Sequence, residues 1–130
     1  MKSVKLIDYI NNELYNNYTI LDVRSDDFSG GNIPNAVNIP SHEYTKIKEF
    51  IKDKNNIIVH CMYSSVRGVG VVKRLTNDFP DKNIILLDGG FNKYFNFIIN
   101  NKDIDISYIE NLNRSLWILN NNNEFKHIRD

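Results

Sequence analysis

Residues 56–68 read NIIVHCMYSSVRG and join an apolar run to a turn of small and polar residues. The run holds three consecutive β-branched residues, which is typical of a strand covered on both faces of a parallel sheet. Apolar residues then recur at helical spacing over residues 66–79, so the strand leads through the turn into a helix. Ligands of open α/β sheets bind where strands end. The stretch therefore predicts an α/β fold with a ligand site at Cys61.

The turn carries two side chains suited to anion chemistry, Cys61 and Arg67, with five residues between them. Backbone N–H groups of a strand-to-helix turn converge on one point, and the helix dipole adds partial positive charge there. Such a setting stabilises a cysteine thiolate, which makes it a nucleophile. The planar guanidinium of an arginine can hold two oxygens of a phosphoryl group at once. We expect Cys61 to be a nucleophile and Arg67 a clamp on a tetrahedral oxyanion.

Short apolar runs alternate with amphipathic stretches along residues 1–98, which predicts a parallel sheet with helical connections. Strands are expected at 19–23, 36–39, 56–60 and 84–87. Helices are expected after Ser3, after Ser41, over residues 66–79 and from Phe91 onward.

The C-terminal part shows a capping-box pattern, with Ser107 followed three residues later by Glu110. This pattern predicts a terminal helix across about 107–119, followed by a frayed tail. At 130 residues, the chain is expected to form a single domain, 1–130.

The composition is that of an ordinary globular protein, with 42% hydrophobic residues, 25% charged residues and a formal net charge of zero. Without a basic excess, the chain is not expected to bind nucleic acid or a membrane surface. Polar residues interrupt the apolar residues at the N-terminus, so no signal peptide is expected, and we expect a cytoplasmic or nuclear protein. The single cysteine, Cys61, excludes an intrachain disulfide. No metal site and no bound cofactor are expected.

The loop HCMYSSVRG (60–68) resembles the active-site loop of the M-phase inducer phosphatases and the eukaryotic arsenate reductases, both of the rhodanese fold. Two further stretches are similar to that family. LDVRSDDFSGGNIPNAVNIP (21–40) resembles its strand-turn-strand segment, and LLDGGFNKYF (86–95) resembles its last strand and Gly-Gly-aromatic turn. The resemblance implies a rhodanese-like fold, with a five-stranded, mostly parallel sheet flanked by helices.

The resemblance also implies roles for the loop residues. Cys61 would be the nucleophile, Arg67 would bind phosphate, and Ser64 or Ser65 would hydrogen-bond the thiolate. The chain departs from the phosphatase pattern at Met62 and Val66, where those loops carry acidic residues that are candidate proton donors. Residues expected to bind substrate, through backbone N–H groups and the Arg67 side chain, are Met62, Tyr63, Ser64, Ser65, Val66 and Arg67.

This family resemblance implies, first, a cysteine-dependent phosphatase that acts on phosphomonoesters, including phosphotyrosine or phosphothreonine proteins. An arsenate reductase that uses an external thiol such as glutathione is the alternative. A sulfurtransferase is a third reading, although the sulfurtransferase loop is one residue shorter. A non-catalytic rhodanese module is a fourth, although such modules commonly lack the cysteine or the arginine. The expected partner is a phosphorylated substrate or oxyanion, and the sequence indicates no particular oligomeric state.

Other polar residues near the ends of the predicted strands are expected to have structural roles. Asp22 is expected to form a buried ion pair with Arg24 or a link to loop N–H groups, rather than to act as a general acid. His60 is expected to be a hydrogen-bonded core residue. The acidic pair before the Gly-Gly turn, Asp26 and Asp27, is expected to be solvated. Three further residues could face substrate, although residues at such positions more commonly cap helices: His42, Glu43 and Asp88.

Overall fold

The computed structural model describes residues 1–130 and contains a five-stranded sheet in the order β1-β5-β4-β2-β3. Every neighbouring pair in this sheet is parallel, which confirms the rhodanese-like α/β arrangement expected from the sequence. The strand at its centre, β4, is the one that leads into the Cys61 turn. The strands are β1 (Lys2–Val4), β2 (Thr19–Asp22), β3 (Val37–Asn38), β4 (Asn56–His60) and β5 (Asn83–Leu87).

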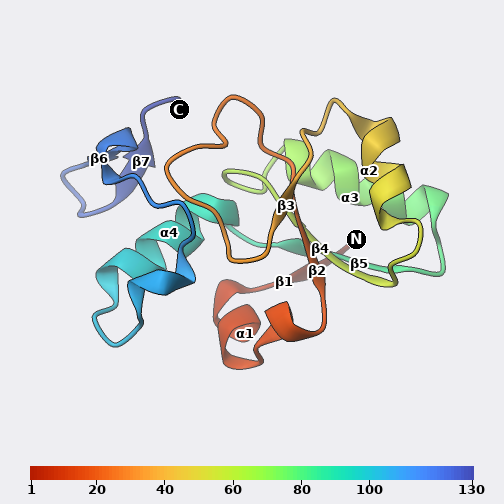
Figure 1. Cartoon of the computed structure of the whole chain (residues 1–130), viewed down its shortest axis with the longest axis horizontal. Coiled ribbons are helices and arrows are strands. Elements are labelled where there is room, and N and C mark those ends of the chain that lie inside the picture. The colour runs from red at the N-terminus through yellow and green to blue at the C-terminus, as the bar shows by residue number, and fades with distance from the viewer.

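Four α-helices connect and cover the strands, with α1 and α4 on one side of the sheet and α2 and α3 on the other (Figure 1). A short 3-10 helix, η1 (Leu14–Asn16), follows α1. None of the helices is both long and apolar enough to cross a membrane. The helices are α1 (Leu6–Asn11), α2 (Tyr44–Ile51), α3 (Arg67–Asp78) and α4 (Gly90–Asn100).

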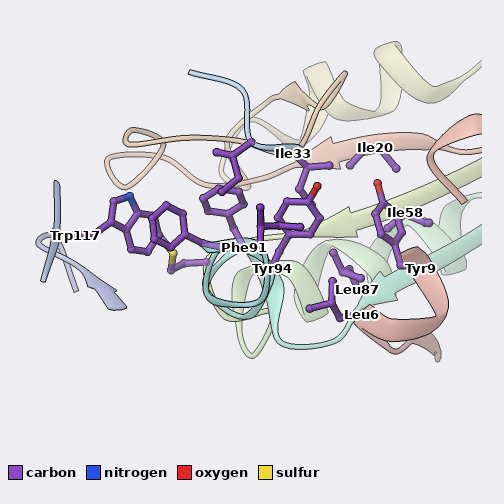
Figure 2. Packing of buried hydrophobic residues seen from close by; sticks show 13 residues of the cluster. Leu6, Tyr9, Ile20, Ile33, Ile58, Leu87, Phe91, Tyr94 and Trp117 are labelled. Atoms are coloured by element: carbon purple, nitrogen blue, oxygen red, sulfur yellow. The ribbon is translucent and has the colours of Figure 1, made fainter. Parts of the chain in front are cut away.

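The central strand contributes to a hydrophobic core on each face, because successive side chains of a strand point to opposite sides. Ile58 packs with the residues of α1 and α4, while Ile57 and Val59 pack with those of α2 and α3. All three are fully buried. Figure 2 shows the first core, in which Phe91 and Tyr94 of α4 lie between the strand residues and Trp117. These two cores fix the C-terminal end of β4, and with it the position of Cys61.

The predicted terminal helix at 107–119 is wrong. This segment forms two 3-10 turns, η2 (Ile106–Tyr108) and η3 (Arg114–Leu116), and then an antiparallel hairpin of β6 (Trp117–Leu119) and β7 (Phe125–His127). Tertiary packing overrides the capping-box pattern, because Trp117 stacks on Phe95 with ring centroids 3.8 Å apart and donates its indole N–H to the Gly30 carbonyl. Asp105, rather than Ser107, caps the first 3-10 turn.

The tail after residue 119 is not frayed either. His127, the last residue of β7, is buried, and its ring hydrogen-bonds with Ser29. The Phe125 N–H donates to the side chain of Asn96, which lies on α4. Hydrogen bonds of this kind hold residues 125–130 beside the loop that joins β2 to β3 (Figure 1).

Candidate active site

Cys61 lies between the end of β4 and the start of α3, as predicted. Its side chain is buried, and its Sγ atom accepts the backbone N–H of Gly68 at 3.2 Å. The sulfur therefore faces the N-terminal turn of α3, where the helix dipole and an N–H group both favour negative charge. A Cβ atom at Gly68 would lie 3.1 Å from Leu86 and 3.4 Å from this sulfur. The small residue lets the helix approach the thiol.

The carbonyl groups of the loop are turned toward α4. Those of Cys61 and Met62 accept the N–H groups of Phe91 and Asn92 at 2.9 and 2.8 Å. Gly90 makes this contact feasible, because it has a φ of +61° and a Cβ atom there would lie 2.6 Å from both carbonyl oxygens. The Gly-Gly turn singled out in the sequence thus holds the loop by its carbonyl groups.

The N–H groups of residues 62–66, in contrast, donate to no other protein group. Met62 contributes only its backbone to the loop, because its side chain is fully buried in the core beneath α4. Ser64 has a positive φ of +53°, and its buried hydroxyl has no protein partner. The other side chains face outward: Tyr63, Ser65 and Val66 are all exposed. The loop therefore offers a row of unused N–H donors and no acidic side chain.

Arg67, the first residue of α3, binds Asp27 through two parallel hydrogen bonds. Its Nη1 donates to Oδ1 at 2.8 Å and its Nη2 to Oδ2 at 2.6 Å. The prediction that Asp27 is solvated is wrong, since Asp27 is buried, whereas Asp26 is exposed as expected. Burial raises the pKa of the Asp27 carboxyl, but the hydrogen bonds and charge of Arg67 outweigh it and hold this pKa below its ordinary value. Asp27 is therefore ionised at neutral pH.

Asp27 is the site residue that sequence reasoning missed. It is 40 residues away from Arg67 in the chain, so no local motif joins them. One signal could have found it. Strands β2 and β4 are neighbours and parallel, so the loops that follow them meet at the same edge of the sheet. An acidic residue in the first loop is a natural partner for an arginine that begins the helix after the second.

A shallow depression of about 280 Å³ lies beside this ion pair and is lined only by polar residues. Two residues of the C-terminal segment, predicted to be frayed, form part of its wall. The residues that line it are Ser25, Asp26, Asp27, Arg67, Arg129 and Asp130.

The expected buried pair between Asp22 and Arg24 is confirmed. Both side chains are fully buried, with the Arg24 Nη2 atom 2.7 Å from Asp22 Oδ2. Arg24 also donates to the carbonyl groups of Asp27 and Gly31. Its guanidinium carbon lies 4.3 Å from the centre of the Phe91 ring. This pair fixes the loop that carries Asp27, and it does not reach the depression.

His60 is a buried core residue, as expected, with one hydrogen bond. Its Nδ1 donates to the Cys61 carbonyl at 3.1 Å, and its Nε2 has no hydrogen-bond partner. Burial, assisted by the charge of Arg24, lowers the pKa of His60 despite Asp22 nearby. The ring is therefore neutral at pH 7 and supports the backbone under the thiol.

The remaining rim residues lie outside the loop. His42 and Glu43 line a separate surface depression before α2, where Glu43 pairs with Lys46 at 2.8 Å. Neither they nor Asp88 forms a hydrogen bond with Cys61 or Arg67. No group of three or more His, Cys, Asp or Glu side chains is placed to hold a metal ion.

Two proteins named as dual specificity phosphatases are similar to part of the chain. The ibp1 phosphatase of Schizosaccharomyces pombe is 42% identical over 57 residues, which is 41% of this chain and 41% of that protein. The Cdc25 phosphatase of Arabidopsis thaliana is 32% identical over 88 residues, which is 58% of this chain and 60% of that protein. The matched regions thus span about half the length of these relatives.

Solved structures agree on the fold. Ygr203w, a yeast protein tyrosine phosphatase of the rhodanese family, superposes with a TM-score of 0.69 at 17% identity, covering 88% of this chain and 95% of its own. The As-Sb reductase of Leishmania major superposes with a TM-score of 0.63 at 16% identity, covering 99% and 94%. Residues 5–96 match the family model of the rhodanese-like domain. The chain therefore belongs to the rhodanese-like domain family.

Proposed function

We propose that this protein is a cysteine-dependent phosphatase that hydrolyses phosphomonoesters, with phosphotyrosine or phosphothreonine proteins as its substrate class. One observation carries the proposal. The Cys61 sulfur accepts the N–H of Gly68 in the first turn of α3, in a loop whose N–H groups at 62–66 are unused and which ends at Arg67. The similarity to two proteins named as dual specificity phosphatases supports it.

The reaction would proceed in two displacements. The Cys61 thiolate forms a bond to phosphorus while the bond to the leaving oxygen breaks, which gives a cysteinyl-phosphate and an alcohol or phenol. Water then attacks the phosphorus, the bond to sulfur breaks, and inorganic phosphate leaves. Arg67 and the loop N–H groups would stabilise the charge that spreads over the three equatorial oxygens in each step.

The loop contains no acidic side chain that could donate a proton to the leaving group. Met62 and Val66 stand at the positions where the resembling phosphatases carry acids. Asp27 does not replace them, because Arg67 holds its pKa low and keeps it ionised. The chemistry therefore suits substrates with a good leaving group or with an acid of their own.

Arsenate reduction is the second candidate, favoured by the same lack of an acid, since arsenate carries O–H groups of its own that can supply the proton for the departing water. Cys61 would form a bond to arsenic with loss of water. A thiol such as glutathione would then attack the sulfur of Cys61, and arsenic would leave as arsenite with the electron pair. A second glutathione would release Cys61 and form the glutathione disulfide. An external thiol is required, because Cys61 is the only cysteine.

Parallel assays of the purified protein separate these candidates. Wild type and Cys61→Ser are assayed with an aryl phosphate, with arsenate plus glutathione, and with thiosulfate plus cyanide. Cys61-dependent phosphate release supports the phosphatase, while Cys61-dependent glutathione oxidation that requires arsenate favours the reductase. Thiocyanate formation would indicate sulfur transfer. Binding of phosphate without turnover of any substrate would indicate a non-catalytic module.

A further inference from the structure

The Asp27–Arg67 pair leaves most of the arginine's hydrogen-bonding capacity unused. A guanidinium has five N–H donors in a fixed planar fork. Asp27 takes one N–H from Nη1 and one from Nη2, which is the end of the fork. No other acceptor binds the Arg67 side chain. The Nε–H and one outer Nη–H, which lie along the same side of the fork, remain free to bind two oxygens of an anion.

Asp27 is itself held in place from two directions. Its carboxylate accepts the N–H of Ser25 at 3.2 Å, and its backbone carbonyl accepts the Nη1 group of Arg24 at 3.3 Å. Arg24 is in turn fixed by the fully buried Asp22. A continuous set of contacts therefore runs from the core of β2 to the guanidinium at the start of α3.

Arg67 is the most exposed of the four charged residues in this set. Its side chain is 31% exposed, compared with 7% for Asp27. A long side chain at the rim has many rotamers, and each one that is lost on substrate binding costs free energy. A buried, ionised carboxylate that holds the end of the fork removes most of that cost in advance. Arg67 is followed by Gly68, whose N–H donates to the Cys61 sulfur, so the guanidinium and the thiol belong to the same turn at the start of α3.

We propose that Asp27 is a positioning residue that holds the end of the Arg67 guanidinium, so that its free side edge faces an oxyanion bound over Cys61. This rests on the proposed function, since it assigns Arg67 the task of binding the reacting oxyanion. Asp27 keeps its contact when the oxyanion binds, because the two anions use different edges of the fork. It touches neither the substrate nor the nucleophile.

The alternative use of the same contact is competition, in which Asp27 occupies the fork and must leave before an oxyanion can bind. The two uses predict opposite effects of Asp27→Asn. If Arg67 is misplaced, it stabilises the transition state less, and a displacement of about 1 Å costs up to about 100-fold in rate. Removing a competitor would instead tighten oxyanion binding. Replacing the carboxylate with a neutral amide also makes the net charge of the site more positive, so the ground-state affinity for a dianion should not fall much.

The test compares Asp27→Asn with Asp81→Asn, which makes the same charge change at an exposed residue before β5, at the opposite edge of the parallel sheet. For Asp27→Asn we expect kcat for an aryl phosphate to fall about 10–100-fold while KM changes less than about three-fold. Asp27→Glu, which keeps the carboxylate, should lose less than Asp27→Asn. Asp81→Asn should stay within about two-fold of wild type. Urea unfolding of each variant verifies that the protein is folded.

A second measurement does not depend on turnover. Vanadate adopts the geometry of phosphoryl transfer at a thiolate, whereas phosphate reports the ground state. Asp27→Asn should lower the affinity for vanadate by the same factor as kcat and leave the affinity for phosphate within about three-fold. If wild type hydrolyses no phosphate ester, the proposed function fails, and the change in the vanadate-to-phosphate affinity ratio still tests Asp27. An unchanged ratio and kcat, or phosphate bound more than ten-fold tighter by the variant, would overturn the assignment.

Discussion

The end of β2 and the loop that follows it take part in two arginine–aspartate contacts, which differ in burial and in the number of hydrogen bonds that the arginine makes. In the Asp22–Arg24 pair both side chains are fully buried, and the arginine donates to a carboxylate and to two carbonyl groups. In the Asp27–Arg67 pair the arginine is 31% exposed and donates only to one carboxylate. An arginine whose three nitrogen atoms all donate to protein groups serves the structure. An arginine with donors left over, at the end of the turn that carries Cys61, can bind a ligand.

The largest expected effect concerns the stability provided by the buried pair. Asp22→Asn leaves the Arg24 charge without its partner in the core, so we expect the free energy of unfolding to fall by about 3–5 kcal/mol. Urea denaturation at pH 7 measures this. Replacing both residues with apolar ones of similar volume should recover part of the loss. A change below about 1 kcal/mol in Asp22→Asn would show that the pair does not hold the loop.

The Asp27–Arg67 pair should show the opposite profile, with a large effect on activity and a small one on stability. A lysine is a point charge and cannot use two edges of a planar fork, so Arg67→Lys should be nearly as damaging as Arg67→Ala. We expect a loss of roughly 2–4 kcal/mol in transition-state stabilisation, measured from kcat/KM, with about 1 kcal/mol or less in unfolding free energy. A lysine variant within a few-fold of wild-type kcat/KM would show that Arg67 does not clamp the substrate.

The smallest expected effect is the pH dependence of the free energy of unfolding, to which His60 and Asp27 contribute over different pH ranges. Burial lowers the pKa of His60 in the folded protein, so the unfolded chain binds the proton first. The free energy of unfolding should therefore fall as the pH drops below about 6.5, by at most about 1.4 kcal/mol per pH unit. The Asp27 pKa is also lowered, so its contribution is lost only at more acidic pH, below its ordinary value of 3.8. Urea denaturation between pH 8 and pH 5 should give a flatter profile for His60→Asn, and identical profiles would contradict this role of His60.

Much of the fold could be predicted because its signals are local. Residues 57–59 are β-branched and fully buried, and the strand predicted at 56–60 matches β4 residue for residue. The helix predicted over 66–79 differs from α3 by one residue at each end. Strand β1 was not predicted, because three residues at a sheet edge carry too little pattern.

The errors arise where distant residues decide the local structure. Glu110, taken as half of a capping box, instead accepts the N–H of Asn35 at 2.6 Å and pairs its backbone with Asn32. Stacking of Trp117 on Phe95 places residues 117–119 in a hairpin rather than a helix. Asp27 was missed for the same reason, because its partner Arg67 is found only once β2 and β4 lie side by side. The roles of Cys61 and Arg67 remain predictions that rest on the loop.

The most direct test of the proposed function is chemical trapping of the intermediate. Wild type is quenched in acid during turnover of an aryl phosphate, and the peptide that contains Cys61 is analysed by mass spectrometry. We expect a phosphoryl group on Cys61 in wild type. Cys61→Ser should show no such group and no turnover while still binding phosphate, because the N–H groups of the loop are unchanged and serine has almost no alkoxide at pH 7. Aryl phosphate hydrolysis at the wild-type rate in Cys61→Ser would contradict the account.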